Sequence, residues 1–168
     1  MNSINPTNSI NIEGFVPGAI GRIAEMHACY YSEHWGFGPF FEAKVATELS
    51  EFIGRFDDQK DGFWTACSNK RVQGSIAIDG IKAHDEGAHL RWYIVSGTLH
   101  GQGVGRQLLS TAMDFCRERR YQRVFLWTFK GLDPAKHLYE KNGFELIHEQ
   151  KGAQWGTTVT EQKYVCEL

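Results

Sequence analysis

The sequence lacks the features that mark several classes of protein. Its 168 residues carry a formal charge of only -2, so it has no basic field to hold a nucleic-acid backbone. Its four cysteines lie far apart, and no pair has the spacing of a zinc knuckle or a redox motif. No run approaches the ~20 apolar residues that a membrane-spanning helix needs. We therefore expect a cytoplasmic protein with reduced cysteines that acts on neither nucleic acid nor membrane and holds no metal.

The sequence does contain enough apolar material for one folded domain. Hydrophobic residues make up 42% and aromatic residues 13% of the chain, which excludes an intrinsically disordered protein. The length suits a single domain, since domains typically run ~100–150 residues. The polar opening MNSINPTNSIN has neither the cationic start nor the apolar run of a signal peptide. We predict a flexible N-terminal segment over residues 1–10 and one domain over residues 11–168.

Hydrophobic periodicity predicts a mixed order of helices and strands. Apolar residues at three- and four-residue steps indicate helices from about Gly18, Phe41 and Val104, and Asp133 with Pro134 suits a helix start with Asp133 as N-cap. Short apolar runs indicate strands at 63–66, 72–78, 90–95, 124–129, 144–148 and 158–166. Two leading helices, three strands and then alternating elements predict an α/β domain around a mixed sheet.

The stretch at residues 90–106, LRWYIVSGTLHGQGVGR, carries the most information about chemistry. A predicted strand there runs into a glycine-rich turn that opens a helix. The first amides of a helix have no partner within it, and the helix dipole favours negative charge at that end. Glycines let an anion approach the main chain. The turn therefore predicts a phosphate or pyrophosphate cradle, with a plain strand-to-helix turn as the alternative.

Two motifs in this order resemble the signatures of the GCN5-related N-acetyltransferases, the GNAT superfamily. Residues His100-Gly101-Gln102-Gly103-Val104-Gly105 occupy the place of the signature Arg/Gln-x-x-Gly-x-Gly/Ala. The second signature, Ala-x-x-x-Tyr-x-x-x-Gly-Phe, is matched by Ala135, Tyr139, Gly143 and Phe144. The chain is especially similar to acetyltransferase domains that occur alone or fused to winged-helix regulators of the MarR type, although it has no winged helix.

The resemblance implies a mostly antiparallel mixed sheet, flanked by helices and splayed between its fourth and fifth strands. Acetyl-CoA would bind in the splay as co-substrate. Main-chain groups of Ile94 and Val95 would hold the pantetheine and the thioester carbonyl. The pyrophosphate would lie on the loop formed by His100, Gly101, Gln102, Gly103, Val104, Gly105 and Arg106. Members of the family transfer the acetyl group directly to the amine of a small molecule or peptide, and many are homodimers.

Two residues are candidates for the proton transfers of such a reaction. The resemblance makes Tyr139 the general acid, and a phenol with a pKa of ~10 is protonated at neutral pH and able to protonate a thiolate. His89 falls where some members place a carboxylate base, and the ordinary pKa of imidazole, ~6.5, suits a base. The alternatives are a core tyrosine and a strand-edge histidine that faces solvent. Glu25 and Glu86 are further candidates for the base on position alone.

Several other residues could have either a structural or a functional role. An aromatic cluster between the first two helices either lines the acceptor pocket or packs the core; it consists of Trp35, Phe37, Phe40 and Phe41. His27 and His34 share a helical face, but without a third ligand we expect packing or rim polarity rather than a metal site. His100 stands where the family has Arg or Gln, and Leu132 where many members have Asn.

The function that these residues predict is an acetyl-CoA-dependent N-acetyltransferase. The alternative from another class is a non-catalytic acyl-CoA-binding sensor or regulatory module. Both would use the glycine-rich turn. They differ in whether Tyr139 and His89 are needed for turnover.

Overall fold

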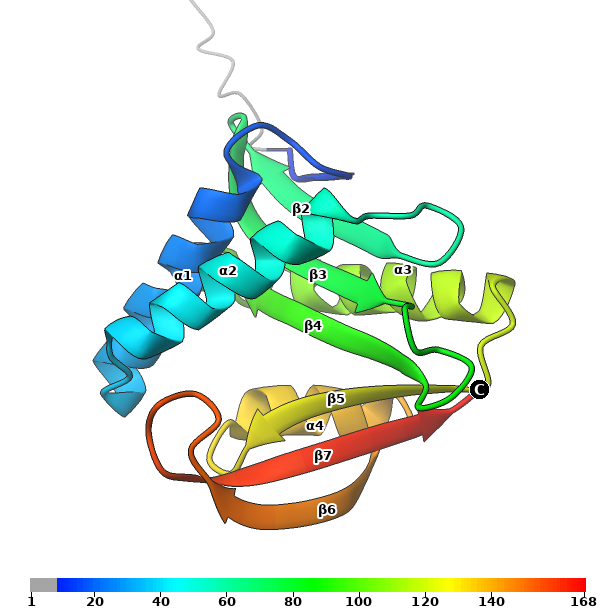
Figure 1. Ribbon diagram of the computed structural model, residues 1–168. Coiled ribbons are helices and arrows are strands. Elements are labelled where there is room, and N and C mark those ends of the chain that lie inside the picture. Colours follow the sequence, from blue (N-terminus) through cyan, green and yellow to red (C-terminus); the bar gives the residue numbers. More distant parts are fainter. Residues whose placement is uncertain (1–8) are drawn as a thin grey trace, which may run out of the picture.

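The fold is a seven-stranded mixed sheet with helices on both faces, seen in a computed structural model that describes residues 9–168. The helices α1 and α2 cover one face, and α3 and α4 cover the other (Figure 1). The elements run in the order β1 (Asn11–Glu13), α1 (Ala19–Trp35), α2 (Pro39–Gly54), β2 (Gly62–Ser68), β3 (Arg71–Asp79), β4 (Ala88–Val95), the 3-10 turn η1 (Gly97–Leu99), α3 (Val104–Glu118), β5 (Arg123–Phe129), α4 (Asp133–Lys141), β6 (Glu145–Gly152) and β7 (Val159–Glu167). The predicted mixed α/β class is confirmed.

The predicted elements are all present, with small corrections at their ends. The short strand β1, which pairs with β2, was not predicted because three residues carry no periodicity. Asp133 is the first residue of α4 rather than its N-cap; that position belongs to Leu132, and no side chain caps the helix. Asp133 still places a carboxylate in the first turn, where the helix dipole favours it. Most of the predicted flexible segment, residues 1–8, lies outside the described residues.

Two apolar clusters hold the helices against the sheet. On one face, α3 packs Leu108, Leu109 and Ala112 against β2, β3 and β4. On the other face, Leu49 and Phe52 of α2 pack with side chains of α1 and the same strands. These faces match the predicted helical periodicity, because side chains three and four residues apart lie on one side of a helix. The core therefore fixes the start of α3 next to the end of β4.

The sheet is antiparallel except where β4 meets β5. These two strands pair in parallel at only two positions, Ala88 with Val124 and His89 with Phe125. Beyond them β5 pairs with β7 along its whole length, and β4 pairs with β3 alone. Figure 1 shows β4 and β5 diverging from this junction. The predicted splay between the fourth and fifth strands is confirmed, and it leaves one edge of β4 open from Leu90 onward.

A bulge bends β4 within this open stretch. The register of β3 against β4 shifts between Ser75 and Ala77, and Trp92 adopts a left-handed backbone with φ of 46°. A non-glycine residue in that region costs about 1–3 kcal/mol and needs its surroundings to hold it. The hydroxyl of Ser75 donates to the Trp92 carbonyl at 2.6 Å, and the Arg91 guanidinium lies 4.1 Å from the centre of the Trp92 ring.

Replacing Leu108 with Ala should destabilise the protein by about 2–5 kcal/mol, the usual cost of a cavity under a buried leucine. Leu108 is fully buried on α3 and belongs to the apolar cluster between this helix and the sheet. Urea unfolding followed by circular dichroism measures the change, with the exposed Ser110→Ala on the same helix as the control. A loss of less than about 1 kcal/mol would contradict the assigned packing of α3.

Candidate active site

A cavity of about 1300 Å³ opens where β4 and β5 separate. All eleven residues that the sequence predicted for the site line this one cavity: His89, Ile94, Val95, His100, Gly101, Gln102, Gly103, Val104, Gly105, Arg106 and Tyr139. We call the part lined by residues 99–106 the loop half. We call the part lined by α1 and α2 the helix half. A single hollow thus joins the glycine-rich turn to the candidate proton-transfer groups.

The loop half presents unpaired backbone donors at the start of α3. Among the described residues, the amides of Val104, Gly105 and Arg106 donate to no carbonyl, and no side chain caps the helix. The helix dipole adds positive potential at this end. Donors and potential together form a site for an anionic group such as a pyrophosphate.

The glycines of this loop are required for its backbone shape. Gly101 and Gly103 both have φ of 77°, a left-handed conformation that other residues rarely adopt. A Cβ at either position would meet open space, so backbone conformation and not crowding selects glycine there. Gly105 differs, because its Cβ would lie 2.8 Å from the Tyr93 hydroxyl oxygen, which donates to the Gly105 carbonyl at 2.7 Å. The loop is therefore shaped by its own glycines and held by β4.

Tyr139 stands on α4 at the wall of the cavity. Its ring lies 6.1 Å from that of Tyr93, measured between centroids. Burial raises the pKa of Tyr139 well above that of a free phenol, and the nearby hydroxyls of Tyr31 and Tyr93 raise it further. The hydroxyl is therefore protonated at neutral pH, as a proton donor must be.

His89 lies on β4 at the point where pairing with β5 ends. Its ring stacks on Phe125, with 4.4 Å between centroids. Burial lowers the pKa of His89 to about 3, and the cationic side chains of Arg91 and Lys163 add to the shift. The ordinary imidazole pKa assumed from the sequence is therefore wrong for this residue. The ring is neutral at neutral pH, but it is a weak base beside two cations.

A network of ion pairs lies along the helix half of the cavity and was not predicted from the sequence. Glu48 of α2 pairs with both Lys44 and Arg91. Arg91 also lies 3.6 Å from the buried carboxylate of Asp79, which pairs with Arg55 at 2.5 Å. The four-residue spacing of Lys44 and Glu48 was visible in the sequence, but the long-range pairs depend on the packing of α2 against the sheet. The network fixes Arg91 beside His89.

Aromatic side chains wall the rest of the helix half. Tyr31 contacts Phe129 of β5, with 5.8 Å between ring centroids, and Trp155 lies 5.6 Å from Phe129 on the other side. Only some members of the predicted aromatic cluster take one of the two roles left open for it. Phe41 is both buried and part of the lining, whereas Phe37 is buried in the core and Phe40 is largely exposed.

The two alternative base candidates do not belong to this site. Glu25 is part of an exposed ion pair with Arg22, and Glu86 pairs with Lys82. Neither carboxylate lines the cavity. In the described part of the chain, no group of three histidine, cysteine or acidic side chains could hold a metal ion. No helix within residues 9–168 is long and apolar enough to cross a membrane.

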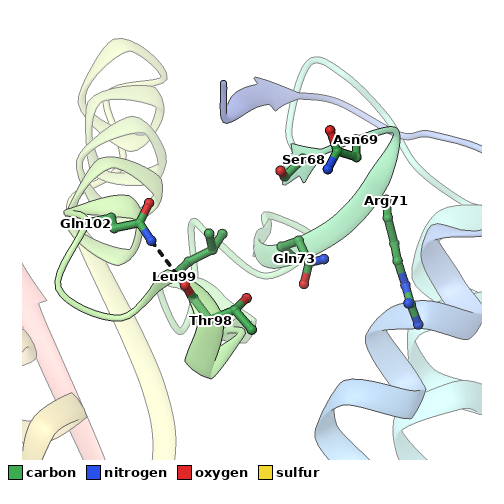
Figure 2. Close-up of a pocket in the computed structure, with 7 residues that line it drawn as sticks. All are labelled: Ser68, Asn69, Arg71, Gln73, Thr98, Leu99 and Gln102. Carbon is green, nitrogen blue, oxygen red and sulfur yellow. Dashed lines mark hydrogen bonds between the residues drawn. The ribbon is translucent and has the colours of Figure 1, made fainter. Parts of the chain in front are cut away.

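A second hollow of about 360 Å³ lies beside the loop half, between the β2–β3 turn and η1. Figure 2 shows it lined by polar side chains, with the Gln102 amide donating to the Thr98 carbonyl at 3.1 Å. The Arg71 side chain runs away toward α1, where its guanidinium lies 3.8 Å from Glu25. Leu99 and Gln102 line both hollows. The two hollows are therefore adjacent at these two residues.

Solved structures share this fold over nearly the whole chain. An acetyltransferase of the GNAT family from Staphylococcus aureus Mu50 superposes with a TM-score of 0.75 at 18% identity, covering 95% of this chain and 99% of that one. The Salmonella typhimurium protein yncA, whose structure contains its cofactor acetyl-CoA, superposes with a TM-score of 0.73 at 16% identity, covering 96% and 95%. At these identities the likeness establishes the fold.

Sequence comparison identifies the family. The chain is 32% identical over 83 residues to the probable N-acetyltransferase camello of Xenopus laevis, covering 49% of this chain and 38% of the relative. It is also 32% identical over 103 residues to N-acetyltransferase 8B of Rattus norvegicus, covering 59% and 46%. The chain thus spans less than half the length of these two relatives. The model of the acetyltransferase (GNAT) family matches residues 20–144, and this chain belongs to that family.

Proposed function

We propose that this protein transfers the acetyl group of acetyl-CoA directly to an amine of a small molecule or peptide. One observation carries the proposal. The unpaired amides at the start of α3 and the protonated phenol of Tyr139 open into the same cavity, at the open edge of β4. An anion site next to a proton donor is the arrangement that thioester transfer from an anionic carrier requires.

The residues of the loop half fit the CoA moiety. The amides of Val104, Gly105 and Arg106 would receive the pyrophosphate, and the open edge of β4 at Ile94 and Val95 would bind the pantetheine arm and the thioester carbonyl. When bound, acetyl-CoA supplies an activated acetyl group on a thiol leaving group. The bulge at Trp92 sets the direction of the open edge just before these residues.

Tyr139 would complete the transfer by protonating the leaving thiolate. The attacking nitrogen forms a bond to the thioester carbon, and the carbon–sulfur bond then breaks. The phenol hydroxyl gives its proton to the sulfur, which leaves as the free thiol. Burial of Tyr139 keeps this proton in place until the thiolate forms.

The acceptor would enter through the helix half of the cavity, which is lined by aromatic rings and by the ion pairs of Glu48 with Lys44 and Arg91. His89 remains the sequence-based hypothesis for the base, because it lines the cavity and its ring is neutral. The cations Arg91 and Lys163 disfavour the imidazolium form that a base must reach. An attacking amine therefore needs a proton acceptor in a better electrostatic position.

Tyr139→Phe should lower kcat by about 10²–10⁴-fold and leave the affinity for acetyl-CoA nearly unchanged, because only the proton donor is lost. Thiol release with an amine panel measures turnover, and calorimetry measures affinity. Tyr164→Phe is the matched control, since that hydroxyl is buried, lies in the same cluster and has no hydrogen-bond partner. Equal turnover in both variants would contradict the role of Tyr139 as proton donor, whereas a wild-type protein that binds acetyl-CoA without any turnover would favour a non-catalytic acyl-CoA sensor.

Gly103→Ala should weaken acetyl-CoA binding by roughly 5–30-fold, because a left-handed alanine costs about 1–2 kcal/mol and shifts the amides that follow it. Gly97→Ala serves as the control, since Gly97 has no positive φ and a Cβ there meets open space. Calorimetric titration of both variants measures the difference. Equal affinities would contradict the assignment of the loop as the pyrophosphate site.

A further inference from the structure

A buried histidine on α1 faces the cavity and has no part in the function described so far. His27 is only 7% exposed and lines the helix half. Its Nδ1 lies 2.8 Å from the carbonyl oxygen of Ile23, one turn earlier in the helix. A carbonyl oxygen only accepts, so Nδ1 carries the hydrogen. The neutral ring therefore has its lone pair on Nε2, at the edge turned away from its own helix.

The surroundings of His27 keep that lone pair available. Burial lowers the pKa of His27 to about 4, so the ring is neutral at neutral pH. The bond to Ile23 acts in the opposite direction, and no charged side chain of the described residues contributes to the shift. No described side chain bonds to Nε2 either. Nε2 is not fully enclosed, so a molecule in the cavity can reach it.

The position of His27 relates it to the proposed proton donor. Its ring is stacked with that of Tyr31 at 6.2 Å between centroids and 19° between planes. The Tyr31 hydroxyl is close enough to Tyr139 to raise the pKa of that phenol. His27, Tyr31 and Tyr139 all line the same cavity. His89 differs from His27, because an added charge on His89 would meet Arg91 and Lys163.

We propose that Nε2 of His27 accepts the proton of the acceptor amine as its nitrogen bonds to the thioester carbon. This inference rests on the proposed acetyl transfer. The amine enters as the neutral base, its lone pair forms the nitrogen–carbon bond, and one N–H proton passes to Nε2. The carbon–sulfur bond breaks, and the thiolate takes the proton of Tyr139. Imidazolium and tyrosinate then neutralise each other, so only the amide and free CoA thiol are formed.

The return of the proton from His27 to Tyr139 is energetically downhill. Burial makes the imidazolium a strong acid and the tyrosinate a strong base, since both buried groups favour their neutral forms. Both residues therefore recover their starting states after each turnover. The same burial that keeps Tyr139 protonated keeps His27 deprotonated.

The test measures thiol release from acetyl-CoA with three primary amines: 2-phenylethylamine, butylamine and glycinamide. His27→Ala should lower kcat by about 10²–10⁴-fold while the affinity for CoA stays unchanged, and added imidazole should restore part of the rate. His27→Gln should be equally slow, because its amide can still donate to Ile23 but has no basic nitrogen. His34→Ala is the matched control, since His34 lies two turns further along α1, is exposed and is absent from the cavity lining.

Distinct results separate this inference from the function on which it rests. Wild-type rates in folded His27→Gln, or a slow His27→Ala that imidazole does not restore, would overturn the role of His27 and leave the transferase activity standing. Loss of rate in His89→Ala with none in the His27 variants would return the role to His89. A wild-type protein that binds CoA and acetylates none of the amines would contradict the proposed function together with this inference.

Discussion

The separation of β4 from β5 is the constraint on which the rest of the site depends. Parallel pairing stops after His89 and Phe125; from there on β5 is paired only with β7 and β4 only with β3. Backbone groups that would bond across a continuous sheet are left open to a ligand. The cavity, the exposure of the loop and the approach to Tyr139 all follow from this break in the sheet.

The packing of the helices turns that opening into an asymmetric site. On one face, α3 is anchored by its apolar side and directs its free amides at the loop half. On the other, α1 and α2 bring aromatic rings and a network of ion pairs to the helix half. In the proposed function, the anionic carrier and the amine would approach from opposite sides of the sheet. Below the helix half, the buried carboxylate of Asp79 pairs with the exposed Arg55.

Local sequence pattern predicts most of the fold because its elements are amphipathic and bounded by turn residues. Gly101 and Gly103 predict the loop by the left-handed backbone they permit, and Tyr139 follows from a second motif at a fixed distance. The chemistry of the histidines could not be predicted in the same way. The pKa of His89 is lowered by burial, by Arg91 and by Lys163, which is on a strand far along the chain, and that of His27 is lowered by burial. The pairing of Glu48 with Arg91 depends likewise on a helix crossing the sheet.

The proposed function depends on recognition of CoA by the opening between β4 and β5. Calorimetric titration of the purified protein with acetyl-CoA, free CoA and ATP tests it most directly. The structure predicts that both CoA species bind at micromolar strength and that ATP does not bind, since the loop and the open strand edge together select the pyrophosphate and the pantetheine arm. If neither acetyl-CoA nor free CoA binds, the assignment of this opening as the CoA site is contradicted.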